Sequence, residues 1–220
     1  MSIEKEIEIT NENDKANIAE ENEKIVYSYC YEDRFQSEDL KERKLFLYGE
    51  IDGCAIDNVV YHILRYNRLD KDTPIKERKP IVVFINSPGG SVVDGFGVVD
   101  AILTSETPVY TVNVASCDSM GLLIYLAGQR RYSMPHSEFL LHEGYSGAFD
   151  SSGKIQDRIR FEGEQVEVMV KDFVIKHSNI APEEYDKNLR REWYFLPKEG
   201  KKLGVVDYIL GEDCPLKEIL

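Results

Sequence analysis

The sequence predicts an α/β domain in which strands and helices alternate along the chain. Residues 80–85 (PIVVFI) form an unbroken apolar run, as expected of a strand buried on both faces. Residues 92–103 and 120–127 each follow a predicted strand and space their apolar side chains as a helix does. The chain's 220 residues suffice for one domain of this kind plus an extension. Such alternation implies right-handed crossovers between parallel strands.

The N-terminal part of the chain differs from the rest in charge. Residues 1–42 hold 13 acidic and 5 basic residues, a net charge of −8 out of −13 for the whole protein. Residues 1–24 contain no aromatic residue and no proline, so they cannot bury enough surface to offset their ordering entropy. We expect a mobile tail there, either a solvated extension or a removable or gating segment. Residues 25–31 alternate as an edge strand or an arm on a neighbouring subunit does.

The remaining elements follow from periodicity and capping. Strands are expected at 44–48, 80–85, 109–114, 139–141 and 205–209, and helices at 37–41, 55–68, 92–103, 120–127, 154–177 and 182–191. The long helix at 154–177 carries an apolar stripe that fits packing either on its own domain or on another subunit. The stripe consists of Val166, Met169, Val170, Phe173 and Val174. We therefore assign residues 1–42 to an acidic, partly disordered extension and 43–220 to one domain.

Composition also excludes several classes of function. The net charge of −13 would repel phosphate backbones, so we expect no nucleic-acid partner. No apolar run approaches the roughly 20 residues that span a bilayer, and the acidic N-terminus does not resemble a signal peptide. The 4 cysteines are scattered, without the spacing of a zinc site or a disulfide framework. Free thiols in a reducing compartment indicate a cytoplasmic protein without a membrane or metal partner.

Candidate catalytic residues lie where predicted strands end. Ser119 stands just before the helix at 120–127, where free N–H groups and the helix dipole favour negative charge, although a serine there often only caps the helix. The paired glycines of the segment 86–90 suit an oxyanion hole or a tight turn. His142 directly follows the strand at 139–141, in a position typical of working residues in α/β folds.

Taken in order, these segments resemble the proteolytic subunit of the Clp protease, the ClpP family. The similar segments are 40–47, 84–90, 115–121, 140–142 and 203–207, and the resemblance covers residues 40–210. It implies the ClpP/crotonase-like fold, a superhelix of stacked ββα units from which the long helix protrudes as a handle. It also implies a serine-type endopeptidase that needs no cofactor and no metal.

The resemblance assigns a role to each candidate residue. Ser119 corresponds to the nucleophile and His142 to its general base, which takes the hydroxyl proton and returns it to the leaving amine. The backbone N–H groups of Gly90 and Met120 correspond to the oxyanion hole. An extended substrate would pair as an added strand with residues 91–93 and with the chain after His142, which favours broad sequence tolerance.

The third member of the triad is where the sequence departs from the family. Counting back without gaps from residues 204–207 places Glu192 where the family carries an aspartate. The extra methylene of glutamate must be absorbed, because a misplacement of about 1 Å can cost roughly 100-fold in rate. Asp186 and Asp207 are rival candidates. Glu192 could also be a surface carboxylate paired with a neighbouring arginine.

The resemblance further implies an assembly and partners. Rings of seven subunits stack in pairs as a homo-oligomeric tetradecamer around a chamber, and a Clp-type ATPase unfoldase delivers polypeptide substrates to it. Asp118 replaces a small residue before the nucleophile, Glu143 and Gly144 stand where a proline is usual, and residues 1–42 do not match the axial loops that engage the unfoldase. These departures indicate a divergent member.

Two alternatives stay open at this point. A catalytically weak or inactive ClpP-like subunit could serve as a scaffold in a mixed ring, as Glu192 and Asp118 would allow. An acyl-CoA hydratase or isomerase of the crotonase fold would also use glycine-loop N–H groups. The coincidence of Ser119 and His142 with the peptidase positions favours the peptidase over the second alternative.

Overall fold

A computed structural model of the chain describes residues 37–144, 147 and 150–220. The chain divides into two units, Met1–Glu42 and Arg43–Leu220. In the first unit, residues 37–41 form the short helix predicted there. The expected mobile tail and the strand predicted at 25–31 lie outside the described residues.

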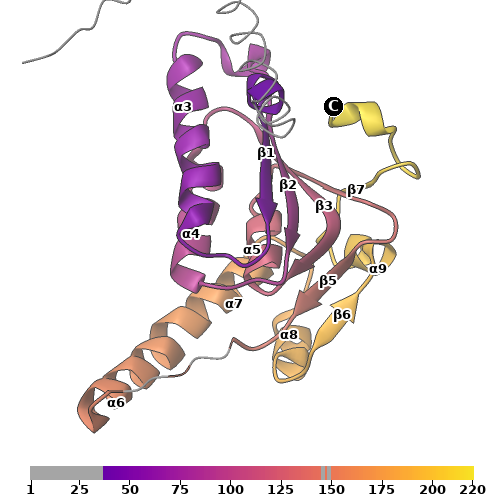
Figure 1. The fold of residues 1–220 in the computed structure, drawn as a ribbon. Coiled ribbons are helices and arrows are strands. Elements are labelled where there is room, and N and C mark those ends of the chain that lie inside the picture. The colour runs from indigo at the N-terminus through magenta and orange to yellow at the C-terminus, as the bar shows by residue number, and fades with distance from the viewer. Residues whose placement is uncertain (1–36, 145–146, 148–149) are drawn as a thin grey trace, which may run out of the picture. The chain divides into compact units, whose positions relative to one another are not determined.

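Within its described residues, the second unit is built on a seven-stranded sheet (Figure 1). Five parallel strands lie side by side in the order β1 (Lys44–Tyr48), β2 (Ile81–Ser87), β3 (Val109–Asp118), β4 (Arg130–Ser133) and β7 (Tyr208–Ile209). The C-terminal half of β3 pairs in parallel with β5 (Glu138–Leu141), which pairs antiparallel with β6 (Trp193–Phe195). The predicted α/β class with a parallel sheet is confirmed.

Helices follow the strands and cover the sheet. Their bounds are Ile56–Val60 (η1, a π-helix), Tyr61–Leu69 (α3), Ile75–Glu77 (η2), Val92–Thr104 (α4), Met120–Leu126 (α5), Ser152–Phe161 (α6), Glu162–Val166 (η3, a π-helix), Glu167–Lys176 (α7), Pro182–Asn188 (α8), Pro197–Lys202 (α9) and Leu216–Glu218 (η4). α5 packs on β2, β3 and β5, and α4 packs on α5. No helix among the described residues is both long enough and apolar enough to cross a bilayer.

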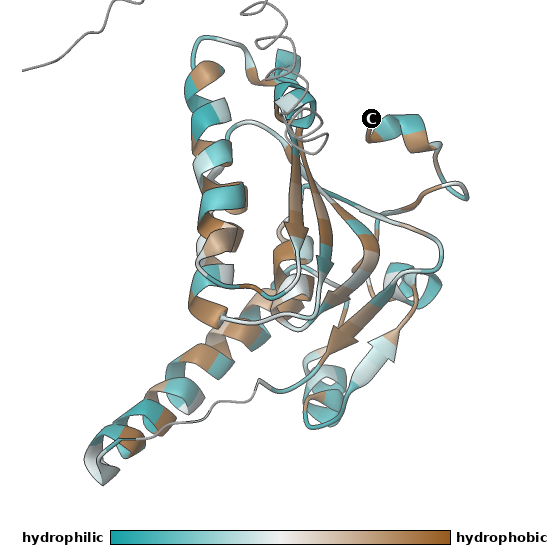
Figure 2. Cartoon of the chain, viewed as in Figure 1, coloured by the Kyte–Doolittle hydropathy of each residue, from teal (hydrophilic) through white to brown (hydrophobic). Residues whose placement is uncertain are grey.

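The core fills both faces of the sheet, and Figure 2 shows the strands mostly in the brown of apolar residues. On one face, Phe139 of β5 lies between Tyr125 of α5 and Phe195 of β6, with ring centroids 5.1 and 5.3 Å away. On the opposite face, Phe84 and Tyr132 belong to a second buried cluster. Burying each such side chain contributes about 1.5–3 kcal/mol to folding. The sheet is therefore a rigid base for the loops at its strand ends.

Several sequence predictions need correction. The strand predicted at 109–114 continues to Asp118, so residues 115–118 are strand rather than turn. The last strand is confined to Tyr208–Ile209, because residues 203–206 form the turn after α9. β4, β6 and α9 were not predicted; β4 has 4 residues and β6 has 3, which is too short to show a periodic pattern.

The helix predicted at 154–177 is present as α6, η3 and α7, which run on from one another, and Figure 1 shows it extending away from the sheet. Its apolar stripe divides into two parts. Phe173 and Val174 are buried in their own domain, and Phe173 packs edge-on against Phe96 with ring centroids 5.8 Å apart. Met169, by contrast, is 43% exposed. Only the outer part of the stripe is left for contact with another subunit.

Candidate active site

The candidate residues meet at one edge of the sheet, where β2, β3 and β5 end. These strands are parallel, so their carboxyl ends lie together, which is where α/β folds place their ligands. Ser87 pairs with Cys117, and Asp118 pairs with Leu140. The residues that directly follow these three strands are the glycine loop, Ser119 and His142, which therefore lie close together.

Ser119 occupies a strained position between β3 and α5. Its backbone has φ 52° and ψ −119°, a conformation that residues other than glycine rarely adopt. Its amide donates a hydrogen bond of 2.9 Å to the carbonyl oxygen of Leu140, two residues before His142. Ser119 is the N-cap residue of α5, but its side chain makes no capping hydrogen bond. The hydroxyl therefore does not cap the helix. The alternative interpretation of the sequence, in which Ser119 is only a capping residue, is not supported.

The glycine loop between β2 and α4 approaches Ser119 closely. A β-carbon on Gly89 (φ 95°) would stand 2.6 Å from the β-carbon of Ser119 and 3.1 Å from the amide nitrogen of Met120. Gly90 (φ 146°) is held on its other side by Ile51, whose carbonyl oxygen would lie 2.4 Å from an added β-carbon. Both positions thus require glycine, for conformation and for space.

Two backbone amides at this edge are available to a ligand. Among the described residues, neither the Gly90 nor the Met120 N–H donates a hydrogen bond to a protein group. Met120 is the first residue of α5, so its amide has no acceptor within the helix. A pair of unused N–H groups beside a serine can bind a developing oxyanion.

His142 is half-buried and follows the last residue of β5. The chain after it is fixed by a hydrogen bond of 2.7 Å from the amide of Glu143 to the carbonyl oxygen of Leu189. The structure places Ser119 and His142 on neighbouring strand ends but does not join them through the serine hydroxyl, which bonds to none of the described residues. Such a gap is common in sites without substrate, where catalytic hydrogen bonds tighten only on binding.

Asp118 adds a negative charge beside this pair. Its Oδ2 accepts a hydrogen bond of 2.6 Å from Ser116, while its Oδ1 is buried without a partner among the described residues. Burial raises the pKa of Asp118 above its ordinary value, although the Ser116 hydrogen bond and the charge of His142 both act in the opposite direction. The charge of His142 therefore acts on the Asp118 carboxylate, but more weakly than burial does.

The β5–β6 pairing stops one residue short of His142 and Glu192. The last recorded pair is Leu141 with Trp193, and the next residue of each chain is His142 and Glu192 respectively. Extended by one more pair, this register would set Glu192 opposite His142, but the chain leaves it there, because the amide of Glu143 bonds to Leu189. Glu192 is exposed, and its Oε2 accepts a hydrogen bond of 3.2 Å from the hydroxyl of Tyr194. Within the described part of the chain it pairs with neither Arg190 nor Arg191.

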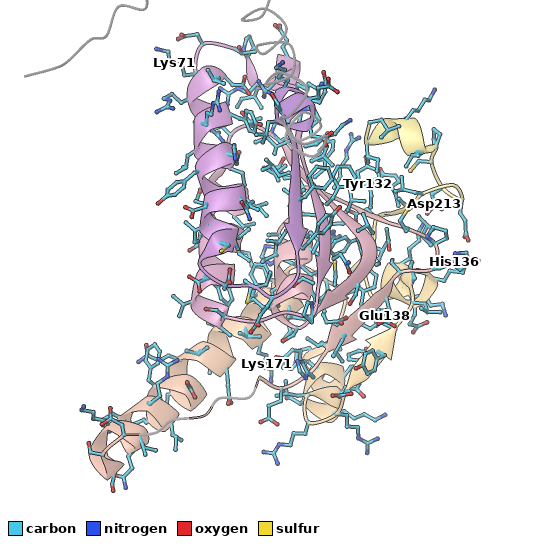
Figure 3. The ribbon with its side chains drawn as sticks, viewed as in Figure 1. Lys71, Tyr132, His136, Glu138, Lys171 and Asp213 are labelled. Atoms are coloured by element: carbon cyan, nitrogen blue, oxygen red, sulfur yellow. The ribbon has the colours of Figure 1, made fainter. Side chains whose placement is uncertain are left out.

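The two rival acids are engaged elsewhere. Asp186 of α8 binds the ammonium of Lys171 at 2.6 Å, and Figure 3 labels Lys171 on α7. Asp207 binds the guanidinium of Arg131 at 2.7 Å and its backbone amide at 2.9 Å. Asp207 thus ties the turn before β7 to β4.

Sequence reasoning missed Gly89, the loop residue nearest Ser119, because two adjacent glycines give no sign of which one faces the serine. It also missed a cavity beside His142, whose walls come from α7 and α8 as well as from the strand ends. Among the described residues, no group of three His, Cys, Asp or Glu side chains could hold a metal ion.

A protein-family model described as Clp protease matches residues 31–213 of the chain.

Proposed function

Since the chain belongs to the Clp protease family, which makes it a ClpP-like serine peptidase in general class, we propose that it hydrolyses peptide bonds through Ser119, His142 and Glu192. The observation that supports this most strongly is the backbone of Ser119. Its strained φ of 52° and its hydrogen bond to Leu140 hold the serine between the unused amides and the end of β5. Strain of this kind at a strand–helix junction is typical of a catalytic residue.

In the proposed reaction, Ser119 Oγ attacks the carbonyl carbon of the scissile peptide bond while His142 takes the hydroxyl proton. The carbonyl oxygen becomes an oxyanion that accepts hydrogen bonds from the N–H groups of Gly90 and Met120. His142 then gives its proton to the leaving amine, and an acyl group stays on Ser119. A water molecule, deprotonated by His142, releases the acid product and restores the serine.

Glu192 would orient the imidazole and stabilise its protonated form. The β5–β6 register, if extended by one residue beyond its last pair, supports this role, and so do the cation partners that occupy Asp186 and Asp207. Because Glu192 is exposed, we expect a smaller contribution than a buried triad carboxylate makes. The substitution Glu192→Gln should lower kcat for a fluorogenic peptide by about tenfold, a modest effect for a group that positions the base. Unchanged turnover in a variant that still assembles would remove Glu192 from the triad.

The family is one of ring-forming proteases, and we propose that this chain forms seven-membered rings that stack as a tetradecamer. Unfolded polypeptides would enter the chamber from a partner ATPase. We also place the protein in the cytoplasm, because its free thiols at Cys54, Cys117 and Cys214 suit a reducing compartment.

The partner ATPase can be tested in cell extract. Degradation of a folded substrate should require ATP, whereas cleavage of short peptides should not. Equal rates of protein degradation with and without ATP would argue against the unfoldase.

A second candidate function is a weakly active or inactive subunit of a mixed ring. The Oδ1 of Asp118, which is buried without a partner in the described part of the chain, favours it, because an added charge beside the imidazole could disturb the Ser119–His142 pair. Peptide hydrolysis by the purified homomeric assembly separates the two candidates. Activity that Ser119→Ala and His142→Ala both abolish supports the peptidase, and no activity above that of the variants supports the scaffold.

A further inference from the structure

A cavity of about 320 Å³ opens beside the proposed catalytic residues. It is bounded by the residues after the glycine loop, by the chain at and after His142, and by the helix formed by α6, η3 and α7. Tyr185 and Leu189 close it from the side of α8. Its size is within the range of cavities that bind part of a ligand.

The cavity is continuous with the reaction centre. Gly90, whose amide would bind the oxyanion, and His142 both line it. A peptide whose carbonyl carbon lies over Ser119 must therefore direct a side chain next to the scissile bond toward this space. The side chain on the acyl side is the nearer one, because its carbonyl oxygen is the atom held by Gly90. This step rests on the proposed function.

The walls of the cavity are apolar near the reaction centre. Val92 and Val93 line it from the start of α4, and Val166 and Val170 line it from the facing helix. The π-helical segment η3 contributes Val166, and π-helical turns often occur beside functional sites. Such walls suit the methylene groups of a long, unbranched side chain.

The charged groups of the cavity are mostly acidic. Glu143, Glu162 and Glu167 line it, and Arg158 is the one arginine or lysine among the described residues that line it. Arg158 is already bound to Glu162, with an Nε–Oε1 distance of 2.5 Å. Within the described part of the chain, Glu143 and Glu167 take part in no ion pair. Two negative charges are thus left uncompensated at this cavity.

Tyr185 gives independent evidence of a polar ligand position. Its side chain is only 2% exposed and lines the cavity, yet its hydroxyl makes no hydrogen bond to any described residue. Burial, followed by the charges of Asp186, Glu167 and Glu143, raises the pKa of this phenol to about 12. Two of these three acids, Glu167 and Glu143, line the cavity, whereas Asp186 binds Lys171 at 2.6 Å, whose ammonium lies 6.0 Å from the centroid of the Tyr185 ring.

We propose that this cavity binds the substrate side chain on the acyl side of the scissile bond and prefers lysine or arginine. Val92, Val166 and Val170 would contact the aliphatic stem. Glu143 and Glu167 would attract the cationic head group, and the hydroxyl of Tyr185 would accept a hydrogen bond from it.

The test compares fluorogenic peptides that differ only at that residue, which is lysine, its uncharged isostere norleucine, or glutamate. The intact assembly should cleave the lysine peptide with a kcat/KM up to about fivefold above norleucine, because one exposed ion pair contributes up to about 1 kcal/mol. The glutamate peptide should be the poorest, and added salt should reduce the preference for lysine. Glu167→Gln and Glu143→Gln should each lower the lysine-to-norleucine ratio.

Glu164→Gln is the matched control, since Glu164 is exposed on the same helix but does not line the cavity. Its lysine-to-norleucine ratio should equal that of the wild-type protein. If the protein reacts with a fluorophosphonate at Ser119 but cleaves norleucine as fast as lysine, the inference about the cavity is wrong and the catalytic assignment stands. If Ser119 does not react at all, both are wrong.

Discussion

Gly89 lies so close to Ser119 that a β-carbon on the glycine would stand 2.6 Å from the β-carbon of the serine. The loop after β2 and the turn after β3 are therefore packed backbone against backbone. Ser119 cannot shift toward the loop, and its hydrogen bond to Leu140 stops it from moving away from β5. The position of the serine is fixed from both sides.

Gly89→Ala should abolish peptidase activity and lower the free energy of unfolding. The added methyl group would displace Ser119 and the carbonyl oxygen of Asp118, which lies 2.9 Å from it, in addition to the strain of φ 95°. Gly211→Ala is the control, because Gly211 also has a positive φ of 82° but has no atom within 4 Å of an added β-carbon. It should cost only the strain, about 1 kcal/mol, and keep full activity. Equal activity in both variants would mean that the loop need not approach the serine.

Asp70→Asn should lower the free energy of unfolding at pH 7 by about 3 kcal/mol, because Asp70 is the buried partner of a charged pair. Its carboxylate, 5% exposed as a residue, accepts hydrogen bonds of 2.5 and 2.6 Å from Arg43 and of 2.8 Å from Thr107. Asp72→Asn is the control, since its pair with Lys71 spans 3.8 Å and both side chains are exposed. Denaturant unfolding should show almost no change for this control.

The effect at Asp70 should depend on pH. The hydrogen bonds from Arg43 hold the pKa of Asp70 below its ordinary value, although burial of the carboxyl group acts to raise it. A lowered pKa stabilises the folded state above the pKa of the unfolded chain, and the stabilisation is lost as pH falls through the folded value. The difference between wild-type and Asp70→Asn proteins should therefore shrink in acid. A constant difference from pH 7 to pH 3 would contradict the ion-pair explanation.

Asp118→Asn should change the free energy of unfolding in the opposite direction from Asp70→Asn. Burial raises the pKa of Asp118, so its ionisation is costly in the folded state: the stability that the group contributes is present below its unfolded pKa and lost as pH rises through the folded value. The variant should be more stable than the wild-type protein at pH 7, by roughly 0.5 kcal/mol because solvent screens a partly exposed carboxylate. This advantage should vanish below about pH 4. A loss of stability at pH 7 would show that the Ser116 hydrogen bond and the charge of His142 outweigh the cost of burial.

Assembly should depend on the outer half of the long helix. Met169 is 43% exposed and Ile159 62% exposed, and apolar side chains exposed together on a helix mark a contact surface. Met169→Glu should reduce the sedimentation coefficient of the assembly from that of a double ring toward that of a single ring or smaller species. Leu220→Glu, at the 63% exposed C-terminal residue, should sediment as the wild-type protein. Identical sedimentation of both variants would exclude the helix from the ring contact.

Much of the fold follows from local patterns in the sequence. β1 has the predicted bounds Lys44–Tyr48, and β2 and α4 differ from prediction by one or two residues at their ends. β4 and β6 were missed because they are strands only through their partners. β6 consists of three residues, and Phe195 is buried because it stacks on Phe139 of β5, a contact between residues distant in the chain.

In the candidate site, too, some residues follow from local sequence patterns and others depend on contacts between distant segments. Ser119 and His142 could be proposed from the sequence because each lies in a segment that resembles the family near the end of a predicted strand, and the structure places them directly after β3 and β5. The position of Glu192 depends on the register between β5 and β6, and no periodicity reveals that register. The acidic cavity could not be foreseen either, because its walls depend on how the long helix packs beside α8.

The most direct test of the proposed peptidase is covalent labelling of the intact assembly with a fluorophosphonate, followed by peptide mapping. The reagent should modify Ser119 alone, since the unused amides of Gly90 and Met120 would hold its phosphoryl oxygen as they hold the oxyanion. Ser119→Ala should remove the label, and His142→Ala should slow labelling at least 100-fold, because the hydroxyl would lose its base. A wild-type assembly that takes up no label, or takes it up at a serine other than Ser119, would contradict the assignment of the catalytic residues.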